Sequence, residues 1–139
     1  MNQITGKKVE TMKRLTDSEW IILNALWDRK PQSMKQIVAA VKEQGSVTWG
    51  YKTYHTYLRN MCEKGLITSE ERNLKDKLYS AAVSREEAMK AESDSIVTRS
   101  NYFGSVGRLV LTMAENNQLT QEDREELVKL AKMLEGGGK

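Results

Sequence analysis

Residues 48–65 read TWGYKTYHTYLRNMCEKG, and this stretch decides which fold the chain adopts. A helix drawn through it separates a polar stripe from an apolar one. The polar stripe consists of side chains at i, i+3, i+4 and i+7: Lys52, His55, Thr56 and Arg59. The apolar stripe lies on the opposite side: Tyr54, Leu58 and Met61. Because a row of donors with no acid before Glu63 suits phosphates and base edges, we predict a DNA-recognition helix.

Start and stop signals predict two shorter helices before this one. Thr16 and Glu19 form a capping-box pattern, which opens a helix over residues 17–29 that Pro31 stops. Ser33 opens a second helix, which ends near Gly45. Their inward-facing residues follow helical spacing: Trp20, Leu23 and Trp27 in the first, and Met34, Ile37, Val38 and Val41 in the second. Three short helices within about 50 residues form a helix-turn-helix arrangement.

Beyond Gly65 the hydrophobic period changes from helical toward alternating, in the order LITSEE, RNLKDK and LYSAAV. Two short strands joined by a charged loop predict a β-hairpin, and a hairpin directly after a helix-turn-helix is a wing. Its tip carries three cations: Arg72, Lys75 and Lys77. These cations either meet DNA phosphates or only keep the hairpin soluble, and the sequence leaves both interpretations open.

The remainder of the chain is predicted to be helical, in one long segment to about residue 102 and two shorter ones. Ser84 with Glu87, and Thr120 with Asp123, repeat the capping-box pattern. The apolar stripes of this part are too short to enclose a core, so we expect a second copy of the chain to cover them. The predicted dimerisation residues are Val106, Leu109, Val110, Met113, Leu127, Leu130 and Leu134.

The predicted fold class is mainly α with a small β-wing, a winged helix-turn-helix DNA-binding domain followed by a C-terminal helical dimerisation module. Four segments are expected: a flexible basic arm over residues 1–14, the winged-helix domain over 15–83, the dimerisation domain over 84–135 and a disordered tail over 136–139. The arm carries four cations, which we expect to be solvated, with contact to DNA as the alternative: Lys7, Lys8, Lys13 and Arg14.

Charge is divided unevenly along the 139 residues. The first 82 residues carry 14 basic and 9 acidic side chains, and the remaining 57 carry 8 and 10, within a net charge of +3. The basic half is therefore the part suited to a polyanion. No apolar run approaches the roughly 20 residues of a membrane helix, and the N-terminus lacks a secretory signal. We expect a cytoplasmic protein without membrane insertion.

Catalytic and metal-binding patterns are missing from the sequence. One cysteine, Cys62, allows neither an internal disulfide nor a multi-cysteine metal site, and the one histidine, His55, completes no catalytic dyad. We therefore expect no enzyme, no metal and no cofactor. A winged-helix module for protein or RNA remains an alternative, because Tyr51 and Tyr57 flank the polar stripe and exposed aromatic rings stack on RNA bases.

Four segments, in order and with similar spacing from Leu15 to Leu134, carry a resemblance to a known family: LTDSEWIILNALW, TWGYKTYHTYLRNMCEKGLI, YSAAVSREE and SVGRLVLTMAENNQLTQEDREELVKL. The chain resembles the penicillinase and methicillin-resistance repressors, winged-helix regulators that include copper-responsive members. The resemblance implies a homodimer that represses transcription at an inverted-repeat operator in double-stranded DNA. It also implies, in the antibiotic-resistance members, a membrane-bound sensor protease that triggers repressor cleavage.

Carried over by position, the family's DNA-contacting Lys-Thr falls on Lys52 and Thr53, and its later threonine falls on Thr56. The Asn-Phe bond cleaved in the antibiotic-resistance members corresponds to Thr112 and Met113, a different pair of side chains. Where the family has Ser-Pro before the Lys-Thr pair, this chain has Gly50 and Tyr51. Tyr54 and Tyr57 stand where the family usually has aliphatic residues. The chain ends in EGGGK, without the cysteine cluster of the copper-responsive members.

Overall fold

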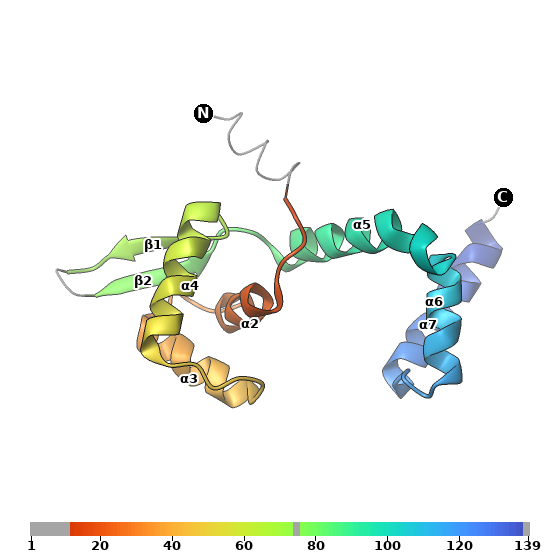
Figure 1. Cartoon of the computed structure of the whole chain (residues 1–139), viewed down its shortest axis with the longest axis horizontal. Helices are drawn as coiled ribbons and strands as arrows, with labels where there is room; N and C mark the ends of the chain where they lie inside the picture. The colour runs from red at the N-terminus through yellow and green to blue at the C-terminus, as the bar shows by residue number, and fades with distance from the viewer. Residues whose placement is uncertain (1–11, 74–75, 138–139) are drawn as a thin grey trace. The chain divides into compact units, whose positions relative to one another are not determined.

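The computed structural model describes residues 12–73 and 76–137. In chain order its elements are α2 (Asp17–Leu26), α3 (Met34–Gln44), α4 (Tyr51–Lys64), β1 (Ile67–Glu71), β2 (Lys77–Ala81), α5 (Arg85–Phe103), α6 (Val106–Glu115) and α7 (Gln121–Gly137) (Figure 1). The chain divides into two compact units, Met1–Ser95 and Ile96–Lys139. The predicted fold class, mainly helical with a small β-wing, is confirmed.

The capping boxes of the first two helices form as the sequence predicts. At the start of α2 the Thr16 hydroxyl accepts from the Glu19 N–H at 3.2 Å, and the Glu19 carboxylate accepts from the Thr16 N–H at 3.0 Å. Ser33 and Gln36 exchange the same two bonds at the start of α3. Each box satisfies two backbone N–H groups that the first turn leaves without helical partners.

The first helix ends at Leu26, three residues before the end predicted from Pro31. Trp27 already has extended backbone angles, and Asp28 adopts a left-handed conformation with φ of 65°. Aspartate tolerates this conformation better than most residues, because its short side chain bonds locally. The early end is favoured by long-range contacts of Trp27, whose ring is buried and bonds to Val83. A local stop signal at Pro31 could not reveal them.

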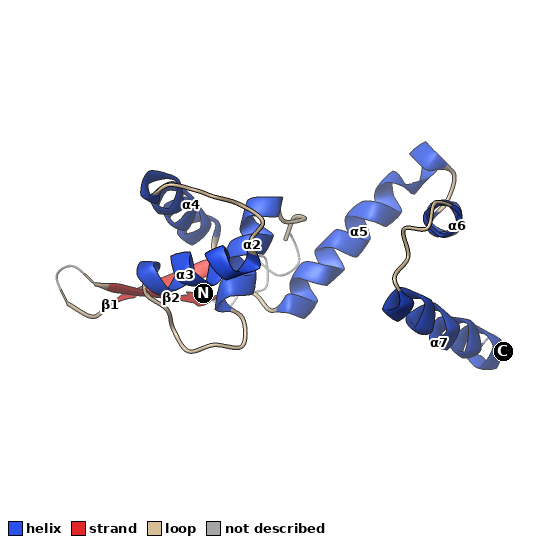
Figure 2. Cartoon of the chain, turned by 90° about the horizontal axis from the view of Figure 1, so that it is seen from below, coloured by secondary structure: helices blue, strands red, loops and turns tan. Residues whose placement is uncertain are grey.

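The hydrophobic core of the first unit lies where α2, α3 and α4 meet the hairpin (Figure 2). Ile22 and Leu23 from α2, Ile37 and Val41 from α3, and Leu58 from α4 are at most 1% exposed. The predicted apolar stripe of α4 is confirmed, because Tyr54 and Met61 are buried beside Leu58. This core holds the outer face of α4 in a fixed position.

The hairpin is antiparallel, with Ile67 opposite Ala81 and Glu71 opposite Lys77. A short backbone pairing, which no sequence pattern predicted, adds to it: Gln32 and Tyr79 exchange N–H···O bonds of 2.9 and 2.7 Å. Because Gln32 directly precedes the N-cap of α3, this pairing ties the wing to the start of that helix. The hairpin is thus attached through β2 to the segment that leads into α3.

α5 begins in the first unit and runs into the second, whose other helices are α6 and α7. The two predicted capping boxes form again, at Ser84 with Glu87 and at Thr120 with Asp123. The sequence predicts a domain boundary at residues 83 and 84, whereas the compact units divide between Ser95 and Ile96. α7 continues through Gly136 and Gly137, into the segment predicted as a tail. The rest of that tail, and residues 1–11 of the predicted arm, lie outside the described residues.

The second unit differs from the first in burial. Among the described residues beyond Ala91, no side chain is buried. Large apolar side chains remain exposed there, including Leu111 at 58% and Met133 and Leu134 at 65%. No helix in the described part of the chain is long and apolar enough to cross a membrane.

Candidate nucleic-acid interface

The outer face of α4 carries the predicted polar stripe. Lys52, His55, Thr56 and Arg59 are all exposed, and Thr53 is half-buried. Within the described residues, none of the Lys52, His55 and Arg59 side chains makes a hydrogen bond or an ion pair. At a rise of 1.5 Å per residue the stripe is about 10 Å long, which fits within the B-DNA major groove. The donors of this stripe are therefore free to contact an external partner.

Aromatic packing fixes where α4 begins. The Trp49 ring lies edge-on to the Tyr54 ring at 5.2 Å and to the Tyr57 ring at 4.9 Å. Such T-shaped pairs are favourable because the positive ring edge meets the negative ring face. The two tyrosines that replace the family's aliphatic residues therefore extend the packing around Trp49. Tyr57 is half-buried in this cluster, whereas Tyr51 is 56% exposed.

α4 starts without a side-chain cap, in contrast to α2 and α3. Its N-cap is Gly50, and its first turn holds no acidic residue. The N–H groups of an uncapped first turn point outward, and the helix dipole adds a partial positive charge there. Lys52 adds a full charge in the same turn. This end of α4 is therefore suited to a phosphate group.

The other end of α4 is closed by two devices. Gly65 takes the left-handed conformation with φ of 81°, and the Leu66 N–H bonds to the Met61 carbonyl, as in a Schellman motif. Lys64 donates to the Glu19 carboxylate of α2 at 2.6 Å. Since this carboxylate also completes the α2 capping box, one side chain connects the start of α2 with the end of α4.

A hollow of about 570 Å³ lies where the start of α3, the face of α4 and the wing meet. Four basic or potentially basic side chains from three elements border it: Lys35, His55, Arg72 and Lys77. Asp76 is its acidic member, and its main-chain N–H and side chain bond to Asn73 within the wing turn. The hollow therefore continues the basic face of α4 onto α3 and the wing. Such a surface matches a DNA backbone that runs beside a major groove.

Lys35 belongs to this face, although the sequence pattern did not single it out. The residue lies in the first turn of α3, just after the N-cap Ser33, and the first helix of a helix-turn-helix motif, here α3, crosses the DNA backbone. That general geometry would have singled out a cation in the first turn of α3. Of the predicted wing cations, Arg72 and Lys77 are exposed at the hollow, and Lys75 lies outside the described residues.

The predicted dimerisation residues lie on α6 and α7 and are half-buried or exposed. Leu109, Val110, Met113 and Leu127 are half-buried, and the three others are exposed: Val106 at 38%, Leu130 at 43% and Leu134 at 65%. Thr112–Met113, the position that the resemblance aligns with the bond cleaved in the antibiotic-resistance members, lies inside α6. The Thr112 hydroxyl bonds to the Arg108 carbonyl one turn earlier, at 2.9 Å.

Comparison with known proteins gives a consistent result. The family model of the penicillinase repressor matches residues 15–133. The chain is 26% identical over 125 residues to the penicillinase repressor of Staphylococcus aureus, which covers 89% of this chain and 92% of the relative. It is 21% identical over 122 residues to the penicillinase repressor of Bacillus licheniformis, with 88% and 92% covered. The resemblance found in the sequence is thereby confirmed, and the chain belongs to the penicillinase repressor family of DNA-binding transcriptional repressors, which are not enzymes.

Proposed function

We propose that the chain is a homodimeric repressor that binds an inverted-repeat operator with one α4 helix in the major groove of each half-site. The observation that carries this proposal is the face of α4, where the Lys52, His55 and Arg59 side chains are exposed and make no hydrogen bond or ion pair within the described residues. A helix face of free donors opposite a buried apolar stripe is the arrangement that base and phosphate recognition requires.

Each exposed side chain on this face has an assigned role in the proposal. Lys52, beside the uncapped start of α4, contacts a phosphate, together with Lys35, Arg72 and Lys77 around the hollow. His55, Thr56 and Arg59 lie along the helix and read base edges, where imidazole and hydroxyl groups offer both a donor and an acceptor. Thr53 is half-buried. Its role as a DNA contact is proposed from the resemblance, which aligns it with the threonine of the family's DNA-contacting Lys-Thr pair.

Dimerisation is proposed to occur through α6 and α7. A described segment of about 40 residues without a buried side chain gains little stability from hydrophobic burial on its own. Its exposed apolar side chains, such as Leu111 and Met133, need a covering surface. A second copy of the same helices is suited to cover them, because twofold symmetry brings matching apolar stripes together.

The first test is selection of duplexes from a random DNA pool at a stated ionic strength. We expect an inverted repeat with half-sites about one helical turn apart. Recovery of no motif, with only weak salt-sensitive binding, would contradict the proposal and favour the protein or RNA module.

A matched pair of lysine variants then tests the assignment of α4. Operator binding weakens as salt rises, with a slope given by log K against log salt concentration. Lys52→Ala should make this slope less steep by about 0.9 per protomer, or about 1.8 for a dimer. Lys90→Ala is the control, because this exposed lysine lies on α5, outside α3, α4 and the wing. His55→Ala or Thr56→Ala should instead change the preferred base, by about 1–3 kcal/mol at one base pair. Equal salt slopes for the two lysine variants would refute the phosphate contact.

A further inference from the structure

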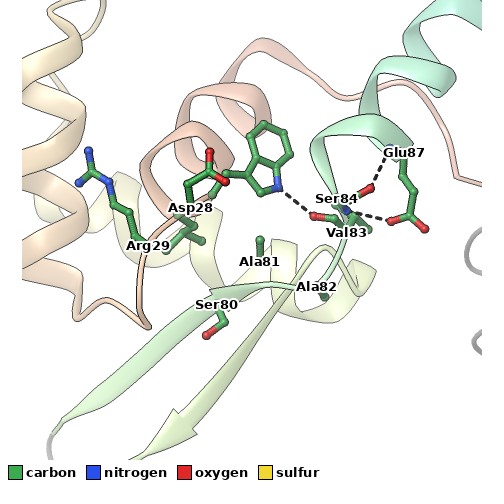
Figure 3. Close-up of a pocket in the computed structure, with 10 residues that line it drawn as sticks. Asp28, Arg29, Ser80, Ala81, Ala82, Val83, Ser84 and Glu87 are labelled. Carbon is green, nitrogen blue, oxygen red and sulfur yellow. Dashed lines mark hydrogen bonds between the residues drawn. The ribbon is translucent and has the colours of Figure 1, made fainter.

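The start of α5 is fastened to the end of α2 inside the first unit. The Trp27 indole N–H donates a buried hydrogen bond to the Val83 carbonyl at 2.9 Å, drawn as a dashed line in Figure 3. Ser84, the next residue, caps α5 through its reciprocal bonds with Glu87. The residue before the cap is thus held by the side chain of the residue that directly follows α2, 56 positions earlier in the chain.

Arg85, the first residue of α5, makes two further contacts with the same turn. Its guanidinium carbon lies 4.9 Å from the centroid of the Trp27 ring. Its Nη1 atom lies 3.0 Å from the Asp28 carboxylate. The Asp28 side chain is 80% exposed, so this ion pair alone contributes little. The cation–π contact and the indole hydrogen bond make Trp27 the centre of the attachment.

The next two turns of α5 also pack on the first unit. Ala88 is 0% exposed and Ala91 is 7% exposed, and such small side chains allow a helix to approach its neighbour closely. Glu92 accepts from the Arg14 Nε atom at 3.4 Å. Beyond Ala91 the described part of α5 has no buried residue. The attachment therefore covers about the first two turns of the helix, all within the first unit.

We infer that Trp27 and Arg85 are positioning residues for operator spacing. By fixing the direction in which α5 leaves the DNA-binding unit, they determine which separation of half-sites a dimer binds. This inference rests on the proposed homodimer. One additional base pair moves a half-site by about 3.4 Å and rotates it by about 34–36°. A fixed exit direction discriminates between neighbouring spacings, whereas a loose one accepts several.

The test measures binding to inverted repeats whose centre is lengthened or shortened one base pair at a time, together with a single half-site. The variants are Trp27→Phe, which removes the indole donor but keeps a ring, and Arg85→Ala. The control is Lys90→Ala, which also removes one positive charge from α5. The ion-pair partner of Lys90 is Asp94, at 3.1 Å on the same helix, so this variant breaks no contact between α5 and Trp27 or Asp28. All four proteins are assayed as full-length chains at one salt concentration.

We expect the wild type and Lys90→Ala to bind the best spacing about tenfold more tightly than its neighbours. This is a small part of the roughly 10²–10⁴-fold effect that linking two modules produces. Both test variants should reduce this preference to about threefold or less, while half-site affinity changes by less than about twofold. If Trp27→Phe unfolds the first unit, the surface variant Arg85→Ala decides the result.

Three outcomes separate the possibilities. Unchanged spacing preference in both variants overturns this inference and leaves the proposed function intact. An equal loss of half-site and full-site affinity also overturns it, because Trp27 and Arg85 would then only stabilise the first unit. A wild-type protein without preference for any inverted repeat contradicts the proposed dimeric repressor, and the inference with it.

Discussion

Glu19→Ala is expected to destabilise the DNA-binding unit by about 1–2 kcal/mol. The Glu19 side chain is 10% exposed, and its two oxygens have separate partners, the Thr16 N–H at 3.0 Å and the Lys64 ammonium at 2.6 Å. Losing the first bond costs about 0.5–1.5 kcal/mol. The second contributes about 0–1 kcal/mol, because the Lys64 side chain is 57% exposed and solvent screens the pair.

The two contributions can be separated with Glu19→Gln. Glutamine also completes a capping box, so this variant keeps the bond to Thr16 and loses only the charge. We expect it to cost no more than about 1 kcal/mol, and less than the alanine variant. Lys64→Met, alone and combined with Glu19→Gln, then gives the coupling energy between the two side chains, expected at about 0.5–1 kcal/mol.

Tryptophan fluorescence during urea unfolding is the suitable assay. All three tryptophans, Trp20, Trp27 and Trp49, lie in the first unit, so the signal reports its unfolding separately from the second. A loss of 1 kcal/mol also lowers the melting temperature of a domain of this size by roughly 4–8 °C. If Glu19→Ala costs less than about 0.3 kcal/mol, or no more than Glu19→Gln, the role assigned to the capping bond is refuted.

Three further predictions concern other parts of the chain. Replacing Leu130 and Leu134 together by aspartate should convert a dimer into a monomer by analytical ultracentrifugation, and a persistent dimer would exclude α7 from the interface. Burial raises the pKa of Tyr79 above its usual value of 10.0, as it does for Tyr54. Because the folded-state pKa lies above the unfolded-state value, the stabilisation is complete below about pH 10 and is lost as the pH rises further. Above that pH, Tyr79→Phe should therefore lose less stability than the wild type. The measurement is the urea concentration at the unfolding midpoint, determined over a series of pH values. Gly45→Ala should cost about 1 kcal/mol in urea unfolding through strain alone, since Gly45 has φ of 75° and an added Cβ meets no atom within 4 Å.

Local sequence signals account for most of the fold that was predicted correctly. A capping box such as Thr16 with Glu19 satisfies backbone donors within four residues, so its effect does not depend on the rest of the chain. Gly65 similarly ends α4 because only a residue without a Cβ adopts the left-handed conformation freely. The exposed stripe of α4 followed from helical periodicity alone, since the buried Leu58 fixes which face turns outward.

The features that the sequence did not reveal depend on contacts between distant residues. The backbone bonds between Gln32 and Tyr79 join positions that share no local pattern. The early end of α2 follows from the Trp27 bond to Val83, which no stop signal encodes. The hollow that Lys35 shares with Arg72 and Lys77 likewise joins the start of α3 to the wing, two segments that are distant in the sequence. Periodicity predicts which face of an element is apolar, but it does not predict which neighbour that face meets.

The two units differ in how many side chains they bury. In the proposed dimer, this difference makes operator binding depend on whether the second unit is paired with another copy. The first unit closes its own core around residues such as Ile22 and Leu58, whereas the described residues of the second unit bury no side chain. If α6 and α7 gain their stability by pairing with a second copy, their folding depends on protein concentration. Any event that separates the copies then loosens both helices and also removes the avidity that joins two half-sites. In the proposed homodimer, an inducing signal would therefore need to act only on the second unit to release the operator, and the recognition helix α4 would stay folded throughout.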